Sequence, residues 1–469
     1  MLRAGGAFAN RQDFLPELAN LGVRSDNSRV SRWESGATSI PHDVIEAYEQ
    51  ILELPRQTLA APIELLTPRT GHAADVTTEA DPANLDRFVE AVLTGDAADG
   101  PSWAALAAQL AQHPAIYLRS TLWRELAGRL ISELCRSVGV AYSARLVALY
   151  KLVAHPMAHN DVLAAIGQYV TDPYTVRASD IIASLAQAPS SGSRFLALGL
   201  LSSGDPQLQV GAARAITSMQ ASRNWVSSLD AELERSTLEL LASETTPTGN
   251  ADLLTYLGVD ARERVLAELG HNLHHRFVVE HATLTSPATA CLIAANVATL
   301  AQASVDAGNA PDRMLERLVR EALFHAHADR RHRAEVLLMA SPFSAGIASA
   351  VTGLLNADDP LIAHRAAVLL RYCVTPAETD GILSARRNRP PAIEGAALAA
   401  LGHVQTLEDS HVAHVLERSA PWADDDRTDA AVYVLGMHGL TDKIARTPVP
   451  DHVASACQWW RRIGSRVAV

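Results

Sequence analysis

Apolar residues recur along this chain at the three- and four-residue spacing of amphipathic helices. From about residue 85 to residue 469, segments with this spacing are interrupted every ten to twenty residues. No stretch alternates apolar and polar residues convincingly, as a half-buried strand would. The pattern predicts an all-α protein in which residues 85–469 form a long helical body.

A short sequence form recurs within this body. It consists of a turn, often Asp-Pro, followed by a helix with small residues around an arginine or an acid, and copies begin at Asp172, Asp205 and Asp359. Aspartate can cap the first free amides of a helix, and proline fits the first helical position. The alanines that follow would let a neighbouring helix approach closely. Each copy is therefore expected to open a packed helix.

The spacing of these helices indicates a repeat. The first two copies start 33 residues apart, and small-residue helices starting at Ala366, Ala396 and Ala430 are 30 and 34 apart. Two-helix units of this size stack into solenoids in which each unit buries its apolar face against its neighbours. Residues 100–445 resemble HEAT-like repeats, although 225–345 do not repeat cleanly. An irregular helical bundle is the alternative.

The first 66 residues form a separate helical segment. Residues 67–84 lose all periodicity and collect Pro, Thr, Gly and Asp, which is typical of a linker. Before the linker, Phe14, Leu15 and Leu18 lie on one face of an expected short helix that ends near Gly22. The sequence thus predicts an N-terminal domain at 1–66, a linker at 67–84 and the body at 85–469.

Two more helices are expected in this domain. Ser25 or Asp26 can cap the second, over residues 27–34, in which Val30 and Trp33 are spaced to anchor it on a core. A third helix follows Pro41, with Val44, Ile45, Tyr48, Ile51 and Leu52 on one face. A helix, a tight turn with glycine and a short polar helix together make the plan of a helix-turn-helix, whose second helix enters the major groove of DNA.

The outer side of the second helix has suitable chemistry for reading DNA. With Val30 and Trp33 facing inward, the residues left outside are Asn27, Ser28, Ser31 and Arg32. Asparagine can pair with adenine and arginine with guanine through two hydrogen bonds, and serine hydroxyls suit phosphate oxygens.

The segment from Ser28 to Gly36, followed by Ile40-Pro41 and then 47–54, resembles the XRE (Cro/C1-type) helix-turn-helix family. The resemblance covers about 45 residues. It implies base contacts by Asn27, Ser28 and Arg32, core positions for Val30 and Trp33, a structural role for Glu34 in fixing the recognition helix to the next loop, and a phosphate contact by Gln12. The expected DNA-binding residues are Gln12, Ser25, Asn27, Ser28, Arg29, Ser31 and Arg32.

The chain departs from this family in two ways. The turn between the first two helices is about two residues longer than usual, which affects the register of Asn27 and Ser28 more than that of Arg32. Only ten residues precede the first clear helix. Either residues 2–8 form a shortened opening helix, or the natural protein starts upstream of Met1.

Charge limits the DNA-binding hypothesis without excluding it. The chain has a net charge of −12, which argues against a body that coats nucleic acid. Residues 1–60 hold six arginines and eight acids, but Arg24, Arg29 and Arg32 cluster. We expect modest affinity per subunit and therefore a homodimer. A helix-turn-helix used only for protein contact is the alternative.

Other site chemistry is weakly indicated. The cysteines Cys135, Cys291, Cys373 and Cys457 lie far apart without Cys-x-x-Cys, which excludes a thiolate zinc finger. Histidines crowd at 271–281 and 325–332, where solvated imidazoles are favoured over metal ligands. No Gly-rich phosphate loop, Gly-x-Ser-x-Gly or His-Glu-x-x-His occurs, so neither an enzyme nor a cofactor is expected. The chain begins with no secretion leader and contains no run long enough to span a membrane, which favours the cytoplasm.

Two clusters late in the chain are expected to have structural rather than functional roles. Arg330-Arg331-His332-Arg333, with arginines 313, 317 and 320, is expected to form a solvated helix face rather than an anion-binding or DNA-backbone face. Trp459-Trp460 is expected to pack down as the end cap of the repeat array.

Taken together, these features predict a transcriptional regulator that binds double-stranded DNA. The helical body would supply the dimer interface and a surface for an effector or a protein partner. A non-catalytic interaction scaffold, whose N-terminal domain docks a partner, is the second hypothesis.

Overall fold

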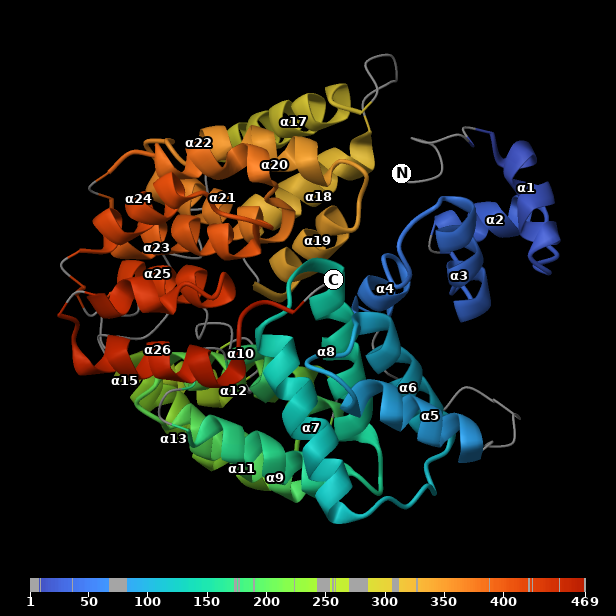
Figure 1. Cartoon of the computed structure of the whole chain (residues 1–469), viewed down its shortest axis with the longest axis horizontal. Coiled ribbons are helices and arrows are strands. Elements are labelled where there is room, and N and C mark those ends of the chain that lie inside the picture. The colour runs from blue at the N-terminus through green and yellow to red at the C-terminus, as the bar shows by residue number, and fades with distance from the viewer. Residues whose placement is uncertain are drawn as a thin grey trace.

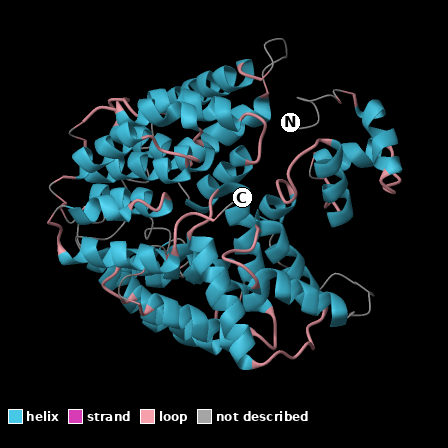
Figure 2. Cartoon of the chain, viewed as in Figure 1, coloured by secondary structure: helices cyan, strands magenta, loops and turns pink. Residues whose placement is uncertain are grey.

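The computed structural model is entirely helical across the part of the chain that it describes, and no strand occurs there (Figure 2). The predicted fold class, a small N-terminal helical unit followed by a helical solenoid, is confirmed. Within the described residues, no helix is long and apolar enough to cross a membrane. The described residues are 8, 10–35, 37–66, 82–172, 175, 178–188, 190–222, 224–242, 254, 257, 259–269, 286–305, 312–325, 328–387, 389–420, 422–423, 425–446 and 448–467.

Three short helices form the N-terminal module: α1 (Arg11–Asn20), α2 (Asn27–Glu34) and α3 (His42–Ile51). Their bounds agree with the helices predicted from the sequence. Gly22, just after α1, has φ +82°, a conformation that glycine adopts without strain, and it turns the chain toward α2. The module has its own small core, made of Phe14, Leu18, Val30, Trp33, Val44, Ala47 and Tyr48.

A buried carboxylate joins the module to the next helix, α4 (Ala60–Leu66). Glu49 is only 4% exposed, and its two oxygens accept hydrogen bonds from the backbone amides of Gln57 (2.9 Å), Leu59 (2.6 Å) and Ala60 (2.9 Å). These amides begin α4 and have no partner inside the helix, so the carboxylate satisfies them. Glu49 therefore fixes the direction in which α4 leaves the module.

Helix α4 packs against the body rather than only against the module. It contacts α8 (Gly139–Ala154) and α19 (Ala328–Met339), and Lys151 of α8 pairs with Glu64 at 2.8 Å. The expected N-terminal domain at 1–66 thus ends in a helix that is part of the body's packing. The expected linker falls largely outside the described residues, but α5 (Pro82–Leu93) begins within it, so its last three residues are helical.

The first half of the body, here the first array, consists of two layers of helices (Figure 1). One layer runs α6, α8, α10 and α12, and the other runs α7, α9, α11, α13 and α15, each helix packing on the next in its layer. The further bounds are α6 Gly100–Gln112, α7 Ser120–Cys135, α9 His159–Val170, α10 Ser179–Ala183, η1 Ser184–Gln187, α11 Ser191–Leu201, α12 Pro206–Ala221, η2 Ser227–Leu229, α13 Asp230–Ala242 and α15 Val259–Glu268.

The second half, the second array, has the same two-layer construction. One layer runs α17, α20, α22 and α24, and the other runs from α18 and α19 through α21, α23 and α25 to α26. The bounds are α17 Pro287–Ala303, α18 Arg313–Phe324, α20 Ser344–Leu354, α21 Pro360–Cys373, η4 Pro376–Glu378, α22 Thr379–Leu383, α23 Pro391–Ala400, η5 Leu401–His403, α24 Asp409–Ser419, α25 Asp426–Met437, η6 Thr441–Arg446 and α26 Asp451–Ile463.

Small residues allow this stacking, as the sequence predicted. The helices carrying Ala366, Ala396 and Ala430 are α21, α23 and α25, which lie side by side in that order. At Gly395 of α23, an added Cβ atom would lie 2.4 Å from the backbone oxygen of Asp426. No side chain fits there, so this crossing needs glycine.

Two of the three Asp-Pro copies open helices as predicted. The Asp205 carboxylate accepts from the amide of Gln207 at 2.8 Å, and that of Asp359 accepts from Leu361 at 2.9 Å. The helix expected after Asp172 falls largely outside the described residues, and the next described helix, α10, begins at Ser179.

The two arrays meet through the C-terminal segment, which returns to the start of the body. Arg136, at the end of α7, donates to the backbone oxygen of Ser465 (3.1 Å) and accepts from the amide of Val467 (3.1 Å). Asp172 pairs with Arg462 of α26. In Figure 1, α26 accordingly lies beside the first array. The arrays therefore close on each other.

Trp459 and Trp460 are packed down, as predicted, but their helix also meets the first array and so does not close a free end. Both rings are 2% exposed and meet edge to face, with their centroids 5.1 Å apart. An added Cβ on Gly436 of α25 would lie 2.2 Å from the Trp460 ring. The pair therefore seals the last helix against α25.

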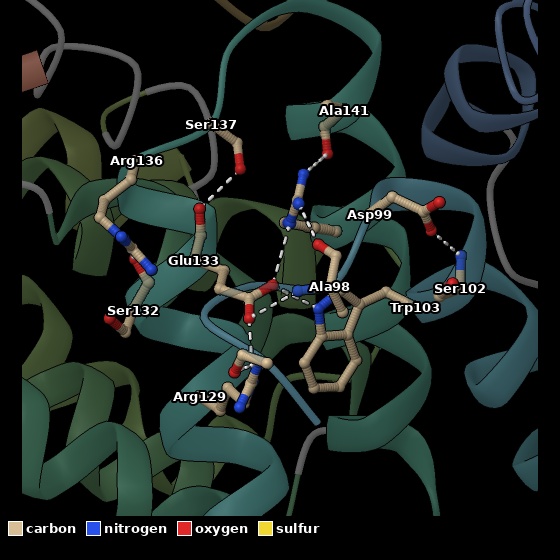
Figure 3. A network of polar contacts seen from close by, with 12 residues as sticks. Ala98, Asp99, Ser102, Trp103, Arg129, Ser132, Glu133, Arg136, Ser137 and Ala141 are labelled. Carbon is tan, nitrogen blue, oxygen red and sulfur yellow. Dashed lines mark hydrogen bonds and ion pairs between the residues drawn. The ribbon is translucent and has the colours of Figure 1, made fainter. Parts of the chain in front are cut away.

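A buried ion pair holds the first helices of the body together (Figure 3). Glu133 of α7 accepts from the Trp103 indole (2.7 Å), the amide of Ala98 (3.1 Å) and Arg129 (2.9 Å). Arg145 of α8 lies 3.5 Å from it and also donates to the backbone oxygens of Ala98 and Ala141. Both charged groups are at most 1% exposed. These hydrogen bonds offset part of the hydration that the two groups lose on burial.

Candidate nucleic-acid interface

Helix α2 is fixed at both ends and along one side. At its start, the Asp26 carboxylate accepts from the Arg29 amide at 2.8 Å, which is an N-cap. Val30 (0% exposed) and Trp33 (8%) insert into the core of the module. At its end, Glu34 pairs with Arg11 of α1 at 2.9 Å. The helix is therefore held as a rigid element.

The opposite side of α2 faces solvent. Asn27, Ser28, Arg29 and Arg32 are exposed, and Ser31 is half-buried. In Figure 1, α2 lies on the side of α4 away from both arrays. These five residues, which we call the outer face of α2, are thus accessible along one short helix, as the sequence predicted.

Within the outer face, Arg29 and Arg32 differ. The Arg29 guanidinium lies 5.5 Å from the centre of the Trp33 ring, within the range of a cation–π contact. At an exposed site such a contact contributes about 0.5–1 kcal/mol, so Arg29 is held against its own helix. The four-residue spacing of Arg29 and Trp33 was a signal for this contact that the sequence argument did not use.

The two predicted contacts outside α2 are placed differently. Gln12 is exposed in the first turn of α1, next to Arg11, and its amide is capped by Asn10 at 3.1 Å. Ser25 is half-buried, and its hydroxyl oxygen is buried without a hydrogen-bond partner among the described residues. In this conformation, Gln12 is available to a phosphate and the Ser25 hydroxyl is not.

Glu34 and Arg11 form a contact that the sequence argument did not predict. Sequence reasoning placed Glu34 in a structural role toward the following loop, and the structure adds an ion pair that joins it to α1 across 23 residues. Gly36, the last residue of the segment that resembles the XRE family, lies outside the described residues. No local pattern pointed to Arg11, because its partner comes from another helix.

Three of the eight acidic residues of the module, Asp43, Glu46 and Glu49, lie on α3. Asp43 and Glu46 line a shallow depression together with Gln50 and with Leu21 to Val23 of the turn. Residues of α2 do not line it. Asp43 and Glu46 are thus carried by a helix other than the one that carries the outer face, whereas Asp26 and Glu34 lie at the two ends of α2.

The basic run at 330–333 is not a uniformly solvated face. Arg331 donates to the backbone oxygen of His325 at 2.7 Å, and His332 hydrogen-bonds the Tyr372 hydroxyl at 2.9 Å. Both side chains are half-buried. The solvated-face interpretation is therefore wrong for these two residues.

A polar network near His332 links the two arrays. Asp180 of α10 pairs with Arg214 and accepts from the Tyr142 hydroxyl. Burial raises the pKa of the Asp180 carboxyl, but Arg214, His332 and Tyr142 outweigh it and hold the pKa below its usual value. Since His332 belongs to the second array, this charge interaction crosses between the arrays.

Glu335 continues the network in α19. Its side chain is 5% exposed, and burial raises its pKa to about 7 despite Arg331, Arg365 and Arg371 nearby. The sequence argument missed Asp180, whose partners lie on other helices. It also missed Glu335, which is near Arg331 of its own helix and Arg365 and Arg371 of α21. The histidine cluster 271–281 lies outside the described residues, and no group of three potential metal ligands occurs within them.

Comparisons with known proteins do not assign a family. No protein-family model matches the chain, and no curated protein matches it. Among solved structures, the crystal structure of an engineered protein matches 81% of this chain and 98% of its own, with 15% identity and a TM-score of 0.23. A likeness this low carries no functional argument, so the residues and their geometry must carry it.

Proposed function

We propose that this protein is a DNA-binding transcriptional regulator that reads a specific double-stranded operator with the outer face of α2. The closed helical body would hold two modules in a homodimer and receive an effector or a protein partner. The proposal places the protein in the cytoplasm and assigns it no catalytic step.

One observation carries the proposal: α2 exposes amide, hydroxyl and guanidinium groups on a helix fixed at both ends. Asn27, Ser28 and Arg32 are exposed, while Val30 and Trp33 hold the helix from behind. A rigid helix with free donors and acceptors along one side suits a major groove, where asparagine and arginine pair with base edges.

The XRE resemblance supports the same assignment. It places Asn27, Ser28 and Arg32 at base-reading positions, and all three are exposed. It places Val30 and Trp33 in the core, where both lie. Gln12, its expected phosphate contact, is exposed at the start of α1. We therefore assign Gln12 to backbone contact and the outer face of α2 to base contact.

The test is loss of operator binding without loss of fold. Genomic fragments bound by the full chain at low salt would be selected, one site footprinted, and its affinity measured by fluorescence anisotropy. Asn27→Ala with Arg32→Ala should weaken binding by about 1–3 kcal/mol for each residue. Gln50→Ala, at an exposed position on α3, is the matched control and should bind normally.

The outcomes separate the two hypotheses. If the double variant keeps its affinity for the footprinted site, or if the native chain selects no fragment, the regulator proposal is wrong. A scaffold whose module docks a protein would retain its partners in a variant that changes only base-reading groups.

A further inference from the structure

Helix α17 carries no charged residue over its whole length, Pro287–Ala303, in a chain with a net charge of −12. It nevertheless lies at the surface. Leu292 is 72% exposed and Leu300 is 53% exposed. These positions are eight residues apart, so both side chains lie on the same face of the helix.

The apolar surface continues past the end of α17. Val305 is 41% exposed, and Met314, at the start of the adjoining α18, is 51% exposed. Val305 follows shortly after α17, and α18 packs on α17, so both residues lie on segments next to this helix. We call this set, Leu292, Leu300, Val305 and Met314, the α17 surface. Contiguous exposed apolar patches mark interaction sites, whereas scattered apolar residues do not.

The position of α17 makes its exposure unusual. It begins the second array, packs on α18 and α20, and lies at the edge of that array in Figure 1. Its inner side is closely packed, since an added Cβ on Gly346 of α20 would lie 2.8 Å from Ala301. Terminal units of repeat arrays usually have a polar outer side. Helix α17 departs from this rule.

The charge of the chain indicates which partner fits this surface. Two copies with net charge −12 repel each other wherever their acidic surfaces meet. The α17 helix is a surface on which they can meet without facing like charges. Between its leucines it exposes small or uncharged side chains, at Ala288, Asn296, Thr299 and Ala303, which allow a second helix to approach.

We infer that the α17 surface binds the same surface of a second copy of this chain. Because one patch serves both partners, the contact has two-fold symmetry and closes at a dimer. The role of this contact in DNA binding rests on the proposed function, because the dimer would bring two α2 helices to the two half-sites of an operator. The dimer itself forms without DNA.

Sedimentation velocity of the full chain over a range of concentrations provides the test. The native chain should have a sedimenting mass twice that of the 50.2 kDa monomer. The double variant Leu292→Glu with Leu300→Glu should have the mass of the monomer. Phe195→Glu, at a 60% exposed position in α11, is the matched control and should remain dimeric. Circular dichroism would verify the fold of each variant.

Disulfide cross-linking provides a second test, which does not depend on whether the leucine variant folds. Asn296→Cys, in the middle of the exposed side of α17, should give disulfide-linked dimers under mild oxidation, and Phe195→Cys should not. A monomeric native chain, or a leucine variant that stays dimeric, overturns the inference. A dimer that binds no DNA fragment would overturn the proposed function and leave this inference standing.

Discussion

The N-terminal module and the start of the body place their charged side chains in opposite ways. On α2, Arg29 and Arg32 lie in solvent. On α7 and α8, Glu133 and Arg145 are buried and bonded to each other. Both regions are helical, so helix formation alone does not distinguish them.

The difference shows what each charge contributes. A buried pair has lost its hydration and must keep its partner, so it fixes the packing of the helices that carry it. An exposed arginine keeps its hydration and its donors, so it contributes little to stability and remains available to a ligand. The comparison predicts that substitutions in the body change stability, while those on the outer face of α2 change binding.

The largest stability effect is expected at Glu133. Glu133→Ala leaves the Arg145 guanidinium buried without its carboxylate, and should lower the free energy of unfolding by about 3–5 kcal/mol. Urea unfolding followed by circular dichroism measures the loss. Glu417→Ala is the control, because its pair with Arg387 is 59% and 56% exposed and should contribute less than about 1 kcal/mol. Equal losses would contradict the comparison.

The Glu335 carboxyl is expected to make the stability of the fold depend on pH. Its raised pKa means that the folded state holds a proton that the unfolded chain has released between about pH 4.5 and 7. Stability from this group is therefore present below pH 4.5 and is lost as the pH rises through 7. The loss amounts to on the order of 3 kcal/mol.

Glu335→Gln stays neutral at every pH and should remove this loss. Urea midpoints measured at pH 5 and pH 8 would report it, with the native chain falling more steeply than the variant. Glu417→Gln, at an exposed carboxyl, serves as the control and should keep the native slope. Parallel slopes for Glu335→Gln and the native chain would contradict the raised pKa.

The smallest of these effects is local and lies where the two regions join. Glu49→Gln removes one of the two oxygens that accept amides at the start of α4, and should cost about 2 kcal/mol in that segment. Hydrogen exchange in peptides covering residues 57–66 should speed up while exchange in α21 does not change. Glu46→Gln, whose side chain is 50% exposed, should leave exchange as it was. If residues 57–66 exchange at the same rate in the native chain and in both variants, Glu49 does not hold α4.

Features that depend on neighbours in the sequence were predictable. The α2 bounds followed from a cap at Asp26 and the spacing of Val30 and Trp33, all within eight residues. The caps at Asp205 and Asp359 followed from Asp-Pro alone. The exposure of Asn27 and Arg32 followed from the same helical periodicity.

Features that depend on distant partners were not predictable. Asp172 has the same Asp-Pro signal as Asp205, but its carboxylate pairs with Arg462, 290 residues later. The burial of the Ser25 hydroxyl depends on how the turn packs on the module. Glu49, Glu133 and Glu335 are ordinary acids in the sequence, and nothing local indicates their burial. Glu133 and Glu335 each have an arginine four residues earlier, but their partners on other helices come only from the fold.

The closure of the arrays also sets an order of events during synthesis. Arg136 cannot form its bonds to the C-terminal segment until Ser465 has been made, 329 residues later. At typical translation rates of about 5–20 residues per second, that interval is roughly 15 to 65 s. The N-terminal module, which has its own core, leaves the ribosome long before then. On each nascent chain, α2 can therefore fold well before the body that is to carry it is complete.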